Sequence, residues 1–275
     1  MIEFHCSKRD KTRTPILYNT EIWEYAESVV GDYKPRLLKE PGKVNAIYFL
    51  ESYLGASVDY QDIYYKEGES PIAGATIFND DVILVFDREG MCVNTIPVSA
   101  NTIILDNATV EDGKEGFANF TALHEGGHFS MHPAVYKRNE LQLCIFEEPK
   151  QGRNVVCCRK SSIERRYLSG RQKLTSGENR EHQANVYAAF VAMPRQTFIP
   201  CATELIKDVG FREGIYIYDD KGGWEYPYYL DQICGKLADL YAVSRTAARI
   251  HLKELNLLVN KYDYELAHAQ MAIPF

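Results

Sequence analysis

The chain has 275 residues, 45% of them hydrophobic and 25% charged, which is enough for one large domain or two small ones with a buried core. Its formal net charge of −7 argues against a protein that mainly grips nucleic-acid phosphates. No apolar run reaches the length of a membrane span, and no signal-peptide segment is visible at the start. Seven cysteines without an evident disulfide framework fit a reducing compartment, so we expect a cytoplasmic protein.

The N-terminal half is expected to form two helices and a small sheet. After a lead-in with little periodicity, apolar spacing predicts helices at residues 21–30 and 43–54. Runs of β-branched and aromatic residues predict strands at residues 57–65, 75–78, 82–86 and 101–105. Because Asn79, Asp80 and Asp81 separate the second and third of these runs, we expect those two strands to form a β-hairpin.

The C-terminal half is expected to be mainly helical. Periodicity, capping residues and prolines predict helices at residues 114–132, 175–193, 196–208, 228–241 and 244–255. Strands are predicted at residues 141–146 and 154–158, which could pair with each other, and at residues 215–218. The last two helices, at about residues 228–258, have a helix–turn–helix pattern. A basic run at residues 159–173 is either a solvated face or a docking surface for an acidic partner.

An HExxH motif, at His124, Glu125 and His128, organises the rest of the sequence. Histidines four residues apart lie on one face of a helix, so both imidazoles can hold one metal ion. The glutamate lies beside the metal, where its carboxylate can take a proton from water bound there. The alternative is an ordinary helix with two solvated histidines.

Two glycines interrupt this helix. Gly126 and Gly127 each cost about 1 kcal/mol relative to alanine in a helix interior. Such a pair is expected where another backbone passes close by, either in close helix–sheet packing or in a bound peptide. We expect a substrate or strand backbone to lie across the metal at this point.

A catalytic zinc needs a third protein ligand and an open position for water. Glu181 is the best candidate, because it shares the apolar, small-residue face of its helix with Asn185 and needs a partner there. Asn185, one turn further on, can hydrogen-bond a ligand histidine and fix its orientation. Glu178 lies on the same face and is the alternative ligand.

Other potential ligands fit less well. His132 lies about 12 Å along the helix axis from His124, so it is expected behind the site or at the surface. Cys157 and Cys158 are adjacent and cannot easily both bind one tetrahedral metal, and the chain contains no CxxC.

These residues together resemble a known family. The stretches Phe120 to His128 and Glu181 to Pro194 look like the zinc motifs of the ImmA/IrrE family of zinc-dependent metallopeptidases. The stretches Gly74 to Phe78 and Leu237 to Leu255 are similar to that family's segments before and after the site. The resemblance covers roughly residues 45–258.

The resemblance implies a fold. It is an α+β, zincin-like fold, in which a small twisted, mostly antiparallel sheet packs against the HExxH helix and a helical C-terminal half follows. We therefore divide the chain into residues 1–40, a lead-in and helix, and residues 41–275, the metallopeptidase domain.

The resemblance also implies an activity. His124, His128 and Glu181 would bind zinc and Glu125 would act as the general base. The substrate would be a helix–turn–helix repressor of transcription, often one linked to a mobile element or a stress response. Gly126 departs from the family, which often has a bulkier apolar residue there.

Substrate binding is expected along an edge strand by β-augmentation, at residues 75–86 or 101–105. A donor besides the zinc would stabilise the oxyanion, and Tyr187 and His182 are candidates. Two non-catalytic functions stay open, a repressor- or DNA-binding regulator with a structural metal and a toxin–antitoxin component. The acidic charge argues against DNA as the partner.

Overall fold

The computed structural model describes residues 1–137, 155–161, 174–219 and 225–271. These residues form a mixed α/β structure with more helix than strand, built around a small mixed sheet. The predicted strand at residues 141–146 and most of the basic run at residues 159–173 lie outside the described residues.

The main sheet has four strands in the order β1-β5-β2-β6. Their bounds are Ser57–Gln61 for β1, Ile72–Ile77 for β2, Thr102–Asp106 for β5 and Val155–Arg159 for β6. β1 runs parallel to β5, whereas β2 is antiparallel to both β5 and β6. β2 is buried along its whole length, so it is the strand on which the layers of the fold meet.

The predicted hairpin of residues 75–86 is wrong. β3 (Asp81–Asp87) pairs with β4 (Cys92–Val98) in a separate two-stranded sheet, while β2 pairs with β5 and β6. The tight turn lies after β3, where Asp87 accepts hydrogen bonds from the backbone N–H groups of Glu89 and Gly90. Asn79 instead marks a corner, because its amide donates to the carbonyl oxygen of Tyr136.

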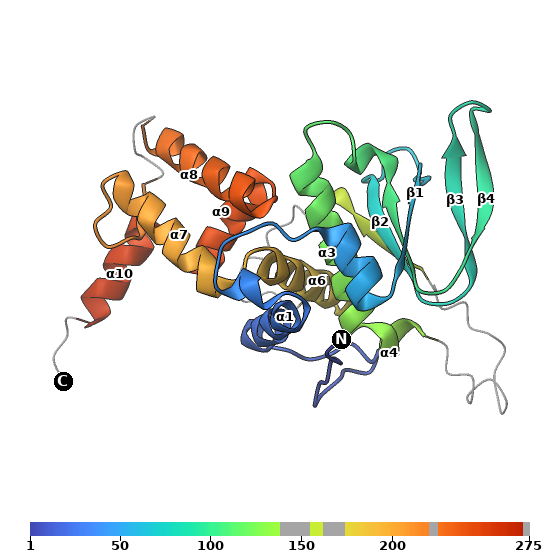
Figure 1. Cartoon of the computed structure of the whole chain (residues 1–275), viewed down its shortest axis with the longest axis horizontal. Coiled ribbons are helices and arrows are strands. Elements are labelled where there is room, and N and C mark those ends of the chain that lie inside the picture. The colour runs from blue at the N-terminus through green and yellow to red at the C-terminus, as the bar shows by residue number, and fades with distance from the viewer. Residues whose placement is uncertain (138–154, 162–173, 220–224, 272–275) are drawn as a thin grey trace.

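The helix α3 (Glu115–Met131) lies between the main sheet and α6 (Ser176–Ala192) (Figure 1). Asn119 anchors the first half of α3, since its amide donates to the carbonyl oxygen of Ala242 and accepts from the backbone N–H of Ala46. The predicted capping box at the start of α6 is present: Thr175 and Glu178 each accept a hydrogen bond from the other's backbone N–H.

The remaining N-terminal elements cover these two helices. They are α1 (Asn19–Tyr33), a 3-10 turn (Pro35–Leu38), α2 (Ala46–Tyr48) continued by a π-helical turn (Phe49–Leu54), a second 3-10 turn (Asn107–Thr109) and α4 (Pro133–Tyr136). Gly55 ends the π-helical turn in the left-handed conformation, with φ of 70°, as expected of a helix-ending glycine. α1 contributes Ile22, Val29 and Val30 to the same buried cluster as α3 and α6. The division at residue 40 stays a prediction.

The C-terminal part is helical and lies at the end of the molecule away from β3 and β4 (Figure 1). Its elements are α7 (Arg195–Asp208), β7 (Tyr216–Tyr218), α8 (Glu225–Tyr241), α9 (Arg245–Glu254), β8 (Leu258–Asn260) and α10 (Lys261–Met271). Ser244 caps α9 as its position before that helix predicts, accepting from the backbone N–H of Ala247. β7 and β8 pair in parallel, and α10 is an element for which the sequence offered no clear pattern.

Candidate metal centre

α3 carries His124, Glu125 and His128 on a buried stretch, where none of the three has solvent-exposed surface. The ring nitrogens Nε2 of His124 and His128 lie 3.1 Å apart. The carboxylate of Glu181, from α6, reaches both rings: Oε2 lies 3.5 Å from Nε2 of His124, and Oε1 lies 3.4 Å from Nε2 of His128. Donor groups of three residues from two helices thus meet at one point.

The spacing of these donor atoms suits a tetrahedral ion. With zinc–nitrogen and zinc–oxygen distances of about 2.0 to 2.2 Å, neighbouring ligand atoms of a tetrahedron stand roughly 3.3 to 3.6 Å apart. The observed separations of 3.4 and 3.5 Å lie within that range, and the 3.1 Å between the two ring nitrogens lies just below it. The donor set of two imidazoles and one carboxylate is one that zinc accepts in catalytic sites.

Hydrogen bonds fix which ring nitrogens are available to an ion. Gln183 donates its amide N–H to the carbonyl oxygen of Pro15 at 2.8 Å, so its oxygen faces Nε2 of His132 at 2.9 Å and accepts a hydrogen bond from the Nε2–H group. Neutral His132 then accepts at Nδ1 from Nδ1 of His128, 3.0 Å away. His128 is left with its lone pair on Nε2, directed at the donor cluster.

His124 is oriented in the same way by Asn185. The amide oxygen of Asn185 lies 2.9 Å from Nδ1 of His124 and accepts its proton, which leaves the lone pair on Nε2. Two nitrogen lone pairs 3.1 Å apart repel each other unless a cation stands between them. This arrangement is the observation in the structure that most directly calls for a metal ion.

The pKa values in the cluster also indicate a place for positive charge. Burial alone would raise the pKa of Glu181, yet His128 and His124 hold it below its ordinary value. Burial would lower the pKa of His124, and the carboxylate of Glu181 more than offsets this and raises it. The buried cluster therefore favours a cation, a proton or a metal ion, next to an ionised Glu181.

Glu125 lies on the sheet side of α3, beside β2. Its Oε2 accepts a hydrogen bond of 2.6 Å from the hydroxyl of Thr76, whereas its buried Oε1 has no hydrogen-bond partner among the described residues. A Cβ atom added at Gly74 would lie 2.9 Å from that Oε1, so only glycine leaves room for the carboxylate. Burial raises the pKa of Glu125 to about 7, which suits a group that takes and returns a proton near neutrality.

Glu178, the alternative ligand, is not part of the cluster, because its carboxylate is held in the capping box with Thr175. Of the two places expected for His132, behind the site or at the surface, the structure shows the first: His132 is fully buried behind His128.

The two candidate oxyanion donors are directed elsewhere: the ring of Tyr187 packs against Tyr25 of α1, and His182 contacts the amide oxygen of Asn19.

The expectation for the two glycines is corrected in part. A backbone does pass close to Gly127, but it belongs to α6: an added Cβ would lie 3.1 Å from Cα of Ala184. At Gly126 an added Cβ would meet side chains, with Leu50 at 2.8 Å. Both glycines thus serve the packing of α3 against other helices, and neither faces a substrate path.

Cys158 is a member of the cluster that the sequence did not single out. Its Sγ and the donor atoms of His124 and Glu181 all lie within 4.8 Å of one another, and the three residues together could hold a metal ion. His128 is not in that set of three, but its Nε2 lies 3.1 Å from Nε2 of His124 and 3.4 Å from Oε1 of Glu181. Burial, followed by the charges of Glu181 and Glu125, raises the pKa of the Cys158 thiol.

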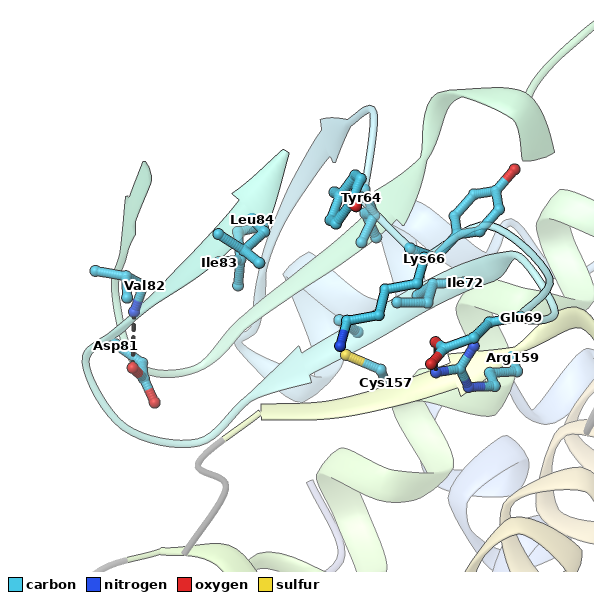
Figure 2. A pocket seen from close by; sticks show the side chains of 13 residues that line it. Tyr64, Lys66, Glu69, Ile72, Asp81, Val82, Ile83, Leu84, Cys157 and Arg159 are labelled. Carbon is cyan, nitrogen blue, oxygen red and sulfur yellow. Dashed lines mark hydrogen bonds and ion pairs between the residues drawn. The ribbon is translucent and has the colours of Figure 1, made fainter. Parts of the chain in front are cut away.

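A pocket of about 550 Å³ lies on the other side of β6 from this cluster. Figure 2 shows Cys157 and Arg159 at its wall, with the β2 and β3 strands around it. Since successive side chains of a strand point to opposite faces, Cys157 faces this pocket and Cys158 faces α3. The pocket is therefore separate from the metal centre.

No family model matches the chain, and no curated protein matches it significantly. Among the described residues, no helix is long and apolar enough to cross a membrane.

Proposed function

We propose that the protein is a zinc-dependent endopeptidase of the ImmA/IrrE type, with a zincin-like fold, which cleaves a helix–turn–helix repressor of transcription. The observation that carries this proposal is the pair of imidazole Nε2 atoms 3.1 Å apart, with a carboxylate from a second helix within 3.5 Å of both. A transcriptional repressor is a cytoplasmic substrate, so the proposal places the protein in the cytoplasm.

His124, His128 and Glu181 would hold the zinc, and Asn185 and His132 keep the two imidazoles turned toward it. When bound, zinc supplies a Lewis acid that polarises a carbonyl and makes water more acidic. Glu125 takes the proton of the attacking water and returns it to the leaving amine. The hydroxyl of Thr76 holds one oxygen of Glu125, which leaves the other oxygen for the water.

The substrate would bind as an extended strand beside β2. β2 passes next to the proposed catalytic glutamate at Gly74 and Thr76, so a peptide paired with β2 in the place that β6 holds would lie over the metal. Of the two strand regions expected to serve this purpose, the one at residues 101–105 lies inside the sheet as β5, between β1 and β2.

The runner-up is a regulator that binds a repressor, or one half of a toxin–antitoxin pair, with a structural metal. The complete burial of His124, Glu125 and His128 favours it, because structural zinc sites are closed. DNA binding by α8 and α9 is not part of either proposal, since the chain is acidic and the turn between these helices is docked on α3 through Asn119.

The test is proteolysis of the repressor encoded beside this protein's gene. Zinc-loaded wild type and Glu125→Gln are incubated with it, and the fragments are resolved by mass spectrometry. We expect cleavage by the wild type and a rate lower by about 100-fold or more with Glu125→Gln, the effect of losing a general base. Zinc is measured in both samples, because equal zinc content assigns the loss to chemistry. Equal cleavage by both, or by neither, refutes the endopeptidase; stable binding of the repressor without cleavage supports the runner-up.

A further inference from the structure

β6 occupies the position in the sheet that the proposed substrate strand needs. It lies at the edge of the four-stranded sheet and pairs antiparallel with β2, from Ile77 opposite Val155 to Ile72 opposite Arg159. A peptide that bound to β2 by β-augmentation would use the same backbone hydrogen-bonding groups. β6 and a substrate strand therefore cannot occupy this edge of β2 together.

The register places the thiol of Cys158 over the centre. Cys158 lies directly opposite Gly74, and opposite residues of an antiparallel pair share one face of the sheet. Gly74 is the residue whose missing side chain makes room for Oε1 of Glu125. Strand pairing thus directs Cys158 to the place where its Sγ lies within 4.8 Å of donor atoms of His124 and Glu181.

Burial of the centre agrees with a strand laid across it. His124, Glu125, His128 and Cys158 have no exposed surface, and only Glu181 keeps 18% of its side-chain surface. Oε1 of Glu125 is buried without a hydrogen-bond partner among the described residues, although a general base must reach water. The sulfur makes a long contact of 3.7 Å with the carbonyl oxygen of Arg159. The thiol also makes a hydrogen bond with the carboxylate of Glu181, so the sulfur faces the proposed metal ligand directly.

We propose that β6 is an internal inhibitory strand, in which Cys158 binds the metal at the position that water needs, and that β6 must leave β2 before a substrate can be cleaved. The inference rests on the proposed function, because it assigns a resting state to that same site. Two imidazoles, a carboxylate and a thiolate complete four-coordination, and such a closed set has no position for the attacking water. A metal ion also keeps a coordinating thiol deprotonated, so thiolate and water compete for one place.

The first measurement asks whether the sulfur binds the metal. Cobalt(II) is substituted for zinc in the full-length chain, and the near-ultraviolet thiolate-to-cobalt charge-transfer band is recorded. We expect the band in the wild type and its loss in Cys158→Ala. Cys157→Ala is the matched control: the same change one residue earlier, on the pocket side of β6 (Figure 2), keeps the band. Cys158→Ser, closer to cysteine in volume, replaces Cys158→Ala if the alanine variant fails to fold.

The second measurement uses the same proteins, loaded with zinc, on the repressor substrate. If most molecules rest in the closed state, the observed cleavage rate is the intrinsic rate multiplied by the fraction of molecules that are open. Removing the thiolate is therefore expected to raise the cleavage rate about tenfold or more. Cys157→Ala is expected to cleave at the wild-type rate.

The outcomes separate the two proposals. If cobalt binds without the charge-transfer band, or if Cys158→Ala cleaves no faster than the wild type, the inhibitory strand is refuted while the endopeptidase stands. If no variant binds cobalt, or none cleaves the repressor, the endopeptidase itself is refuted, and the inhibitory strand with it.

Discussion

At the scale of single residues, the two candidate zinc ligands on α3 are turned into position by amide side chains of α6. Asn185 accepts the Nδ1 proton of His124, and Gln183 acts on His128 through His132. Asn185→Ala removes the first of these bonds without removing a ligand. We expect zinc affinity to fall by about 10- to 100-fold, the usual cost of losing such a partner.

Competition with a chromogenic chelator measures this change. Asn179→Ala makes the same substitution six residues earlier on α6, and its zinc affinity should equal that of the wild type. Unchanged affinity in Asn185→Ala would show that His124 does not depend on this bond.

Gly74 is the residue whose substitution tests the placement of the general base. In Gly74→Ala the new methyl group would lie 2.9 Å from Oε1 of Glu125, so the carboxylate must move. A displacement of this size lowers the cleavage rate by about 100-fold, while zinc stays bound because no ligand is touched. In the control Gly177→Ala, at the start of α6, the nearest atom lies 3.9 Å away and activity should be retained. A fully active Gly74→Ala would mean that Glu125 does not act from this position.

The residues that the sequence predicted and those that it missed differ in one physical respect. His124, His128, Glu181 and Asn185 lie on helices, where a period of 3.6 residues alone decides which side chains share a face. Cys158, Thr76 and Gly74 reach the centre through strand register, which depends on pairings between segments far apart in the chain. No local pattern indicates that Cys158 stands opposite Gly74.

At the scale of elements, the close approach of α3 to α6 sets the geometry of the candidate centre, because the two helices carry the proposed ligands His124, His128 and Glu181. Gly127→Ala tests this approach, since its Cβ would lie 3.1 Å from Cα of Ala184, a backbone atom that cannot turn aside. Overpacking costs about 1–3 kcal/mol, and alanine returns about 1 kcal/mol in helix propensity. We expect a net loss of about 1 kcal/mol in the free energy of unfolding, measured by urea denaturation.

The matched control for this change is Gly235→Ala in α8, where the nearest atom to the added Cβ lies 3.6 Å away. It should leave stability unchanged or raise it. Stabilisation by Gly127→Ala would show that α3 and α6 can separate at little cost.

The contact of α9 with α6 predicts a pH dependence of stability. His251 is fully buried against Phe190 and Phe198, and its Nε2 donates to the carbonyl oxygen of Met193. Burial lowers its pKa to about 3, from the ordinary 6.5. Between these values the unfolded chain holds a proton that the folded chain lacks, so stability falls as the pH drops from 6.5 toward 3.

His251→Gln keeps an N–H donor but cannot titrate. Urea unfolding at neutral pH and in mild acid should show a smaller loss of stability on acidification for this variant than for the wild type. The exposed His5→Gln should lose as much as the wild type. Equal losses in wild type and His251→Gln would contradict a buried neutral imidazole.

Most helices of the described chain could be predicted because their caps and apolar periods are local signals, as at Thr175 and Ser244. The hairpin prediction failed for a different reason. β2 and β3 are both good strands and a turn-forming stretch joins them, but β2 is buried on both faces and pairs with β5 and β6 instead. Burial in the folded protein decided which strands pair with β2, and the sequence of a single segment does not show that burial.

At the scale of the whole molecule, the metal centre lies where the sheet and the helical layer meet. α3 is shared by both, because it lies between the main sheet and α6 (Figure 1). Its proposed base, Glu125, is directed at β2, and its proposed ligands, His124 and His128, are directed at Glu181 of α6. An ion at this point would connect two helices that the sequence separates by more than 40 residues, from Met131 to Ser176. Its binding free energy would therefore add to that of folding.

The most direct test of the account is the zinc content of the purified full-length chain after equilibrium dialysis. We predict about one zinc ion per chain in the wild type and in Glu125→Gln, and a large loss in His124→Ala and Glu181→Ala. Circular dichroism of each variant verifies that the fold is kept. A wild type without zinc, or a Glu181→Ala protein that binds zinc as tightly as the wild type, would contradict the three-ligand centre.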